Sequence, residues 1–300
     1  MTDLHDSIRS EIGDWPPGTR YATCPACSHL RRKKHSRCLS ITVHDDRAMF
    51  FCHHCEIRGV VFRDGASKIS PAQVKQRQAE ADALLHADAE RRVGLARRIW
   101  QQTVPAPETP VETYLRFRGY GSEIPPTLRY ARLRHPGTGQ ACHDVMVAAV
   151  GHDEMPVAIH RTYLAAGGHG KAKFGDLDIK LCLGPIAGQP IRLDAVADVA
   201  DAVYDTLAIG EGVETTLVAL EVLGLPAWAA ISAGNLPKLQ IPDYVKTVTI
   251  VADHDEAGIT KAREAKTLWV SQGRTVRLIL PRDPGSDLND MLRLDAQEIA

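Results

Sequence analysis

The sequence predicts an α/β protein with a small metal-binding module at its amino-terminal end. Three observations lead to this prediction: two C-x2-C pairs, a proline-free helical stretch after them, and strands that alternate with helices in the last hundred residues. The 300 residues suffice for about two domains and a third small one. Hydrophobic residues make up 44% of the chain and charged residues 24%, which excludes wholesale disorder and a coiled-coil rod.

The sequence predicts no membrane span and no secretory leader. The longest clear apolar run, Val145 to Val150, falls far short of the roughly 18 residues that a bilayer span needs. Asp3, His5 and Asp6 occupy positions where a signal peptide would be apolar. We therefore expect a cytoplasmic protein with no membrane partner.

Residues 1–66 are expected to form a zinc ribbon. An odd number of cysteines, seven, argues against a disulfide framework, whereas two knuckles separated by 24 residues suit a structural zinc site with Cys24, Cys27, Cys52 and Cys55 as ligands. Between the knuckles, 39–44 alternates as a strand and 47–51 returns as a second one. Two pairs of free buried thiols are the alternative, and the substitute ligands are Cys38, His35, His53 and His54. The isolated Cys142 and Cys182 are expected to be buried as small hydrophobic residues.

The same module is predicted to bind nucleic acid, although a ribbon can also be a purely structural staple. Residues 18–63 contain nine basic and three acidic residues, including the run Arg31, Arg32, Lys33 and Lys34. Phe50 and Phe51 lie on the returning strand, and we expect one of them to face the core. Cations beside aromatic rings are typical of single-strand binding surfaces.

Residues 67–109 are expected to form a helical linker. The stretch 72–102 is rich in Ala, Gln, Glu and Arg, follows Ser70-Pro71, and is ended by three prolines from Pro105 onward. Its apolar positions are sparse, which favours a partly exposed connector.

Residues 110–200 are predicted to form a mixed α+β subdomain. Two apolar runs, 145–150 and 157–159, flank a Gly-containing turn and indicate a hairpin. Arg161, Lys171 and Lys173 gather around the glycine-rich segment 167–170, which either contacts a phosphate backbone or is an ordinary exposed turn. The segment lacks the residues of a phosphate-binding P-loop.

Residues 201–300 are predicted to form a parallel sheet covered by helices. Strands are expected at 206–210, 227–231, 247–252 and 275–280, with helices at 213–223 and 256–272. Acidic residues follow these strands: Glu211 the first, Asp253 and Asp255 the third, and Asp287 with Asn289 and Asp290 the fourth. Parallel sheets carry their functional groups beyond the carboxyl ends of the strands, so these carboxylates are expected to share a divalent cation, Mg²⁺ being the natural choice. The segment is also acidic, with fifteen acidic and nine basic residues.

Three segments of this last region resemble the motifs of the Toprim family: Gly210-Glu211-Gly212, 253–258 (DHDEAG) and 286–290 (SDLND). The family includes bacterial-type primases, type IA and II topoisomerases, certain nucleases and RecR-type repair proteins. A zinc ribbon ahead of a Toprim domain is similar to bacterial and phage primases. Residues 114–119 (YLRFRG) resemble the segment that opens the primase core, and 160–164 (HRTYL) resemble a segment of mobile-element primases.

The resemblance implies a short DNA primase of the phage or plasmid kind, with residues 110–200 as the amino-terminal part of its core. It implies Glu211 as the acid/base and metal-linked carboxylate, Asp253 and Asp255 as the principal ligands of Mg²⁺ or Mn²⁺, and Asp287 as a third acidic position. Such an enzyme joins ribonucleoside triphosphates into RNA primers on a single-stranded DNA template, and a separate replicative helicase can be its partner. The alternatives are metal-dependent strand cleavage by a nuclease or topoisomerase, and a non-catalytic single-stranded DNA-binding accessory.

Overall fold

The computed structural model describes residues 4–14, 16–30, 35–45, 47–55, 57–63, 71–152, 154–193 and 205–281. The chain divides into two compact units. Unit 1 comprises 1–89 with 176–178, and unit 2 comprises 90–175 with 179–300. No described helix is long and apolar enough to cross a membrane.

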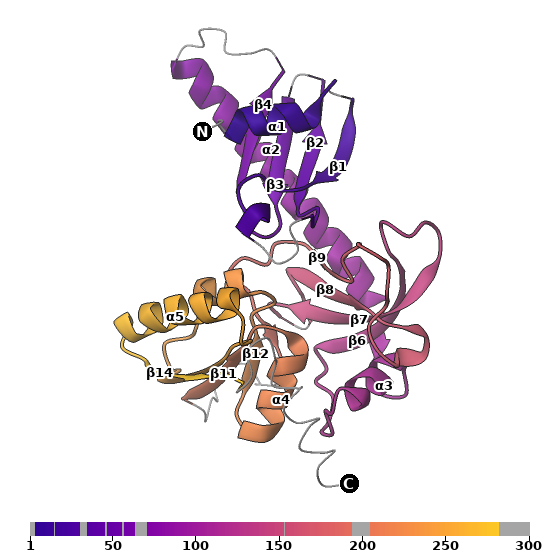
Figure 1. Cartoon of the computed structure of the whole chain (residues 1–300), viewed down its shortest axis with the longest axis vertical. Helices are drawn as coiled ribbons and strands as arrows, with labels where there is room; N and C mark the ends of the chain where they lie inside the picture. The colour runs from indigo at the N-terminus through magenta and orange to yellow at the C-terminus, as the bar shows by residue number, and fades with distance from the viewer. Residues whose placement is uncertain are drawn as a thin grey trace. The chain divides into compact units, whose positions relative to one another are not determined.

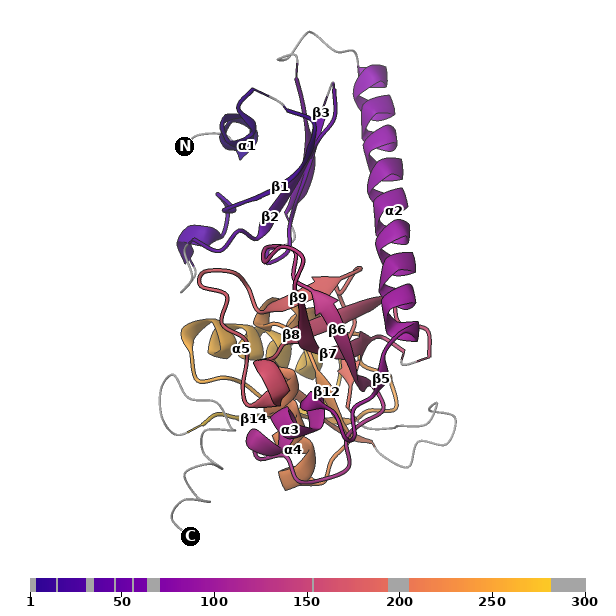
Figure 2. The same cartoon turned by 90° about the vertical axis from the view of Figure 1, so that its right-hand side faces the viewer.

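Unit 1 is built on a four-stranded antiparallel sheet in the order β1-β2-β3-β4. Its elements are α1 (Leu4–Ile12), β1 (Gly18–Ala22), η1 (Ser28–Leu30), β2 (Leu39–Val43), β3 (Arg47–Cys52), β4 (Arg58–Phe62) and the first part of α2 (Pro71–Gln101). One face of the sheet is apolar because Leu39, Ile41 and Val43 alternate with polar residues along β2, and α1 covers this face (Figure 2). Phe50 is buried there and Phe51 points to the opposite face, as expected.

Unit 2 begins with the end of α2 and an antiparallel sheet in the order β5-β6-β7-β8-β9. This part contains β5 (Val104–Pro105), α3 (Pro110–Phe117), β6 (Leu128–Arg134), β7 (Cys142–Val150), β8 (Ala158–Tyr163), η2 (Ala166–Gly168) and β9 (Lys180–Leu183). The apolar run in β7 is buried on both sides of the sheet. Val145, Val147 and Ala149 pack with Trp100 of α2, while Met146 and Ala148 pack with Tyr114 of α3.

The second sheet of unit 2 has the order β10-β12-β11-β13-β14. It contains β10 (Ile191–Arg192), β11 (Thr206–Gly210), α4 (Val213–Leu223), β12 (Ala227–Ala229), η4 (Ala233–Lys238), β13 (Thr247–Val251), α5 (Glu256–Ser271) and β14 (Thr275–Ile279). β12, β11, β13 and β14 run parallel, and β10 joins the edge antiparallel to β12. Leu207 and Ile209 pack with Trp269 of α5, whereas Gly210 approaches Thr216 of α4, so helices cover both faces (Figure 1).

The predicted α/β fold class is confirmed, with the ribbon, the antiparallel middle sheet and the parallel sheet all present. The edge strand β10 was not predicted, because two residues are too short to show a period. The stretch after the ribbon forms one helix of 31 residues, α2. The last turns of this helix are partly exposed, and Ala96 and Trp100 are buried there against the middle sheet. Ser70, the expected helix cap, lies outside the described residues.

Candidate functional site

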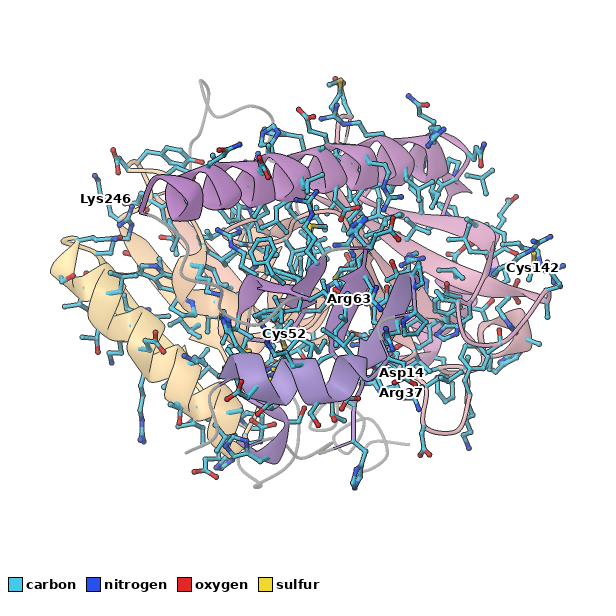
Figure 3. The ribbon with its side chains drawn as sticks, turned by 90° about the horizontal axis from the view of Figure 1, so that it is seen from above. Asp14, Arg37, Cys52, Arg63, Cys142 and Lys246 are labelled. Atoms are coloured by element: carbon cyan, nitrogen blue, oxygen red, sulfur yellow. The ribbon has the colours of Figure 1, made fainter. Side chains whose placement is uncertain are left out.

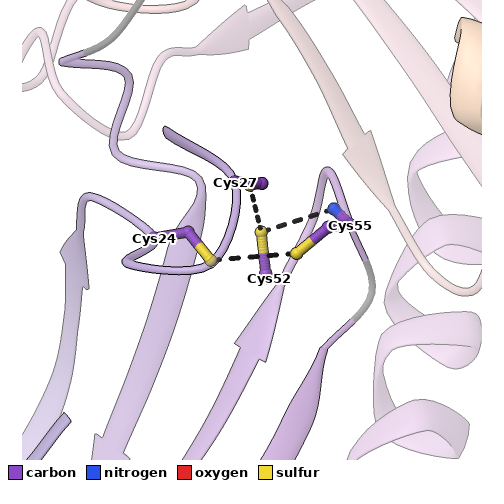
Figure 4. A group of neighbouring side chains, drawn as sticks. All are labelled: Cys24, Cys27, Cys52 and Cys55. Atoms are coloured by element: carbon purple, nitrogen blue, oxygen red, sulfur yellow. Dashed lines mark hydrogen bonds between the residues drawn. The ribbon is translucent and has the colours of Figure 1, made fainter. Parts of the chain in front are cut away.

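The four cysteines of the two knuckles converge at one end of the sheet of unit 1 (Figure 4). Their sulfurs all lie within 4.8 Å of one another; Cys24 Sγ is 3.8 Å from Cys55 Sγ, and Cys27 Sγ is 3.6 Å from Cys52 Sγ. Thiolates bound to zinc at about 2.3 Å in a tetrahedron are separated by about 3.8 Å, so the cluster fits a zinc ion. Burial raises the pKa of the Cys27 and Cys52 thiols, a cost that a bound cation offsets.

A fifth sulfur lies beside this cluster. Cys38 is buried, and its Sγ is 3.6 Å from Cys52 Sγ and 3.9 Å from Ser28 Oγ. It is not among the four sulfurs that share the common centre. The four knuckle cysteines are therefore the group whose geometry fits a metal ion, and Cys38 packs against this group.

One row of side chains crosses the face of the ribbon sheet opposite α1, near the cysteine cluster. α2 runs along the same face (Figure 2), where Arg47 Nη1 lies 3.7 Å from Glu80 Oε2. Tyr21, Ser40, Phe51 and Arg58 are direct neighbours on the four successive strands and so point to the same side of the sheet. Tyr21 is 50% exposed and Arg58 is exposed. The ring of His53 lies 5.0 Å from the ring of Phe51 and 6.2 Å from the ring of Tyr21, measured between centroids. The face thus offers aromatic rings beside a cation, the combination that single-stranded nucleic acid binds.

In unit 2, three acidic residues lie at the carboxyl edge of the parallel sheet. β11 ends at Gly210 opposite the end of β13 at Val251, so Glu211 and the Asp253–Asp255 segment leave the sheet side by side. Asp255 is the N-cap of α5, and its Oδ1 accepts a hydrogen bond of 2.7 Å from Gly258 N. A Cβ atom at position 258 would lie 2.7 Å from the Asp253 carbonyl oxygen, so only glycine allows this tight turn.

Glu211 has acidic neighbours that make its charged form unfavourable. Burial, reinforced by the charges of Asp253 and Asp255, raises the pKa of Glu211 to about 7, although a hydrogen bond from the Ala233 backbone and the charge of Lys180 oppose the shift. The segment before Ala233 is itself strained, since Ile231 has a φ of 74°, which is rare for a β-branched residue. The chemistry of these carboxylate oxygens suits a divalent cation such as Mg²⁺ or Mn²⁺. Among the described residues, however, only the four cysteines bring three or more ligand atoms close enough together to share one ion.

A second acidic residue, three positions after Glu211, has the opposite surroundings. Glu214, on the first turn of α4, is 5% exposed and lies among cationic and hydroxyl groups. Tyr114 OH donates a hydrogen bond of 2.7 Å to Oε1, Lys171 Nζ lies 3.0 Å from Oε1, and Lys180 Nζ lies 3.0 Å from Oε2. Against the effect of burial, the two ammonium groups hold the pKa of Glu214 well below its usual value.

The two lysines connect Glu214 with the acidic edge. Burial lowers the pKa of Lys180, but the Glu214 carboxylate outweighs this effect and raises it, with a contribution from Asp253. Burial lowers the pKa of Lys171 despite the same carboxylate. The sequence predicted Lys171 as a nucleic-acid contact but missed Lys180, Glu214 and Tyr114. The sequence signal that could have pointed to this group is a second glutamate, Glu214, three residues after Glu211.

The other cations predicted for unit 2 have different positions. Lys173 is exposed and lines an open cleft of about 590 Å³ together with Lys171, His143, His169 and Phe174. Arg161 is half-buried on β8, where its Nη2 lies 3.5 Å from the carbonyl oxygen of Cys182. Neighbouring His160 is buried, which together with the charge of Lys180 lowers its pKa to about 3 and keeps the ring neutral.

Several predicted residues fall outside the described part of the chain: Arg31, Arg32, Lys33, Lys34, Asp287, Asn289 and Asp290. The expectation for Cys142 is wrong, because this residue is exposed at the start of β7 (Figure 3). Cys142 is the first residue of the strand and follows a turn, so solvent reaches its side chain. Cys182 is half-buried, and burial raises its pKa to about 12.

Family comparisons agree with the geometry of unit 2. Residues 206–298 match the family model described as the Toprim domain, so this part of the chain is a Toprim domain. Residues 90–193 match the model described as "Domain of unknown function (DUF7146)". No curated protein matches the chain in sequence.

Solved structures of primase fragments are similar to this chain. The zinc-binding and RNA polymerase domains of the Aquifex aeolicus primase align over 99% of this chain and 81% of that one, with 13% identity and a TM-score of 0.43. The primase fragment of the bacteriophage T7 primase-helicase aligns over 94% and 98%, with 13% identity and a TM-score of 0.41. A DNA primase domain from Pseudomonas aeruginosa aligns over 58% and 55%, with 19% identity and a TM-score of 0.35. Because all three TM-scores lie below 0.5, the function proposed below rests on the residues of this chain and on its Toprim domain.

Proposed function

We propose that this protein is a metal-dependent nucleotidyltransferase of the primase kind, which makes short RNA primers from ribonucleoside triphosphates on single-stranded DNA. One observation carries the proposal. Within a single unit, the acidic edge of the Toprim sheet lies beside Lys180, which Glu214 pairs together with Lys171. Acids that bind a divalent cation beside cations that bind phosphate are the parts that phosphoryl transfer requires.

Glu211, Asp253 and Asp255 would hold Mg²⁺ or Mn²⁺, with Asp287 as a further acidic position. A cation bound there neutralises triphosphate charge and makes a 3′-hydroxyl more acidic. Glu211 would also be the base that takes up the proton this hydroxyl loses. Lys171 and Lys180 would bind phosphate oxygens, and Lys173 and Arg161 would contact the nucleic-acid backbone near the cleft.

The zinc ribbon would hold the template. Tyr21 and Phe51 provide rings on which bases can stack, and Arg58 with the Arg31–Lys34 run provides cations for the phosphates. Unwinding of duplex DNA would fall to a separate helicase.

A synthesis assay tests the proposal. The full chain, zinc and magnesium are incubated with single-stranded DNA circles and labelled ribonucleotides, and short oligoribonucleotides are expected. Asp253→Asn should abolish the product, because it removes a charged metal ligand, whereas Asp243→Asn, which changes an exposed aspartate of the same unit, should leave synthesis intact. Shortened DNA in place of RNA would identify a nuclease. If neither product forms, the protein would be a non-catalytic accessory.

A further inference from the structure

The buried acid of α4 does not lie with the other carboxylates of the Toprim edge. Both oxygens of Glu214 are engaged, Oε1 by Tyr114 and Lys171 and Oε2 by Lys180. A carboxylate whose two oxygens already accept from a hydroxyl and two ammonium groups has little capacity left for a metal ion. Glu214 thus needs a role other than that of a metal ligand.

Its partners come from distant parts of unit 2. Tyr114 lies on α3, Lys171 follows η2, and Lys180 begins β9, whereas Glu214 lies on the first turn of α4. Lys180 and Glu214 are separated by 34 residues in the sequence. Glu214 therefore fixes, from the Toprim side, the positions of two cations supplied by the antiparallel sheet.

Glu214 holds Lys180 close to the residues that are expected to bind metal. Its ammonium group interacts electrostatically with Asp253 and with Glu211, both of them expected metal ligands. A Cβ atom at Gly212 would lie 4.0 Å from Lys180 Nζ and 3.6 Å from Glu214 Oε2, so this pair lies immediately beside the motif that carries Glu211. An ammonium group released from Glu214 at that position remains beside the motif that carries Glu211.

We propose that Glu214 is a positioning residue that keeps Lys180 from forming ion pairs with the metal-binding carboxylates. The inference rests on the proposed cation site at Glu211, Asp253 and Asp255. Without Glu214, Lys180 competes with the divalent cation for the same oxygens. With Glu214 in place, Lys180 stays available for phosphate and the acids stay available for metal.

A double-mutant cycle on Mn²⁺ binding tests the inference. Free Mn²⁺ is measured by electron paramagnetic resonance in titrations of the zinc-loaded full chain, for the wild type, Glu214→Gln, Lys180→Met and the double variant. Glu214→Gln should weaken Mn²⁺ binding roughly five- to tenfold, the effect expected when a unit charge moves into contact with the site. In the Lys180→Met background the same Glu214→Gln change should have almost no effect, because the competing ammonium group is gone.

Equal effects of Glu214→Gln in both backgrounds would overturn the inference, since plain loss of charge or of structure is additive. Glu221→Gln, on the same helix, is the matched control and should bind Mn²⁺ like the wild type. Circular dichroism and zinc content check folding, and if Glu214→Gln does not fold, Glu214→Asp takes its place in the cycle because its shorter carboxylate cannot reach both lysines. Failure of the proposed cation site gives a different result: the wild type would then bind no Mn²⁺ that Asp253→Asn removes. Failure of primer synthesis alone would leave this Mn²⁺ binding unchanged.

Discussion

At the scale of residues, Glu211 and Glu214 show that two carboxylates three positions apart can have opposite surroundings. Glu211 lies among other acids, and its pKa rises to about 7. Three residues later, Glu214 lies between two lysines, and its pKa falls well below the usual value. Groups whose surroundings drive their pKa values apart can take different roles, so Glu211 is suited to exchange protons and Glu214 to remain charged.

The low pKa of Glu214 predicts an acid-dependent loss of stability. Above the unfolded-state pKa of about 4.5, the ion pairs of Glu214 contribute fully to the free energy of unfolding. As the pH falls from there towards the folded-state pKa, the unfolded chain takes up the proton first, so this contribution is lost. Glu214→Gln should therefore lower the free energy of unfolding by on the order of 3 kcal/mol near neutral pH, because it leaves two partly buried lysines without their counter-charge. The difference from the wild type should shrink as the pH falls below 4.5.

Urea unfolding followed by tryptophan fluorescence at a series of pH values measures this difference. Glu221→Gln, which removes a more exposed carboxylate from the same helix, controls for the general effect of acid. A gap between wild type and Glu214→Gln that stays constant through the acidic range would contradict the assignment of the low pKa to Glu214.

At the same scale, the sequence revealed less about Glu214 than about its neighbour. Glu211 follows a recognisable strand, and a strand end is sufficient to place it at the sheet edge. Glu214 lies inside a helix that is predicted from the spacing of its apolar residues. That spacing does not show that a charged residue is buried. Its partners are contributed by β9, the segment after η2, and α3, and only tertiary contacts bring them together.

At the scale of elements, the two knuckles were predictable because each C-x2-C pair is local and its spacing fixes the geometry of the turn. The strands 39–44 and 47–51 and the four parallel strands were also predictable, since alternation or an apolar run defines each of them. The burial of Trp100 at the end of α2 was not predictable, because it depends on the position of the middle sheet relative to the helix.

The ligand set of the ribbon predicts the response of zinc binding to cysteine substitution. Cys24→Ser removes one of four sulfurs within 4.8 Å of one another, so the purified protein should lose its zinc and the fold of the ribbon. Cys38→Ser removes a buried sulfur only 3.6 Å from Cys52 Sγ, yet the protein should keep one zinc per chain. Zinc released by a mercurial reagent and measured with a colorimetric chelator gives both values. Zinc loss in Cys38→Ser with retention in Cys24→Ser would place Cys38 in the ligand set.

At the scale of the whole molecule, charge separates the two functions that we propose. Residues 18–63 carry nine basic and three acidic residues, whereas 201–300 carry nine basic and fifteen acidic residues, although the whole chain has a net charge of only −1. A positive ribbon attracts a nucleic-acid backbone, and an acidic Toprim region attracts divalent cations. The sequence alone supports this division, because summing charges by region needs no coordinates. The boundaries 1–66, 67–109, 110–200 and 201–300 remain predictions.

This division predicts how single-stranded DNA binding responds to salt. Replacement of Arg31, Arg32, Lys33 and Lys34 by alanine should reduce the slope of log affinity against log salt by about 3, because each phosphate contact on a single strand contributes about 0.7 to the slope. Phe51→Ala should weaken binding roughly five- to a hundredfold through lost base stacking and leave the slope unchanged. Fluorescence anisotropy of a labelled oligonucleotide over a series of potassium chloride concentrations measures both quantities. Arg263→Ala/Lys266→Ala, which removes exposed cations from α5, is the control and should change neither. A slope that falls in this control but not in the variant of the ribbon would show that template binds to the Toprim region.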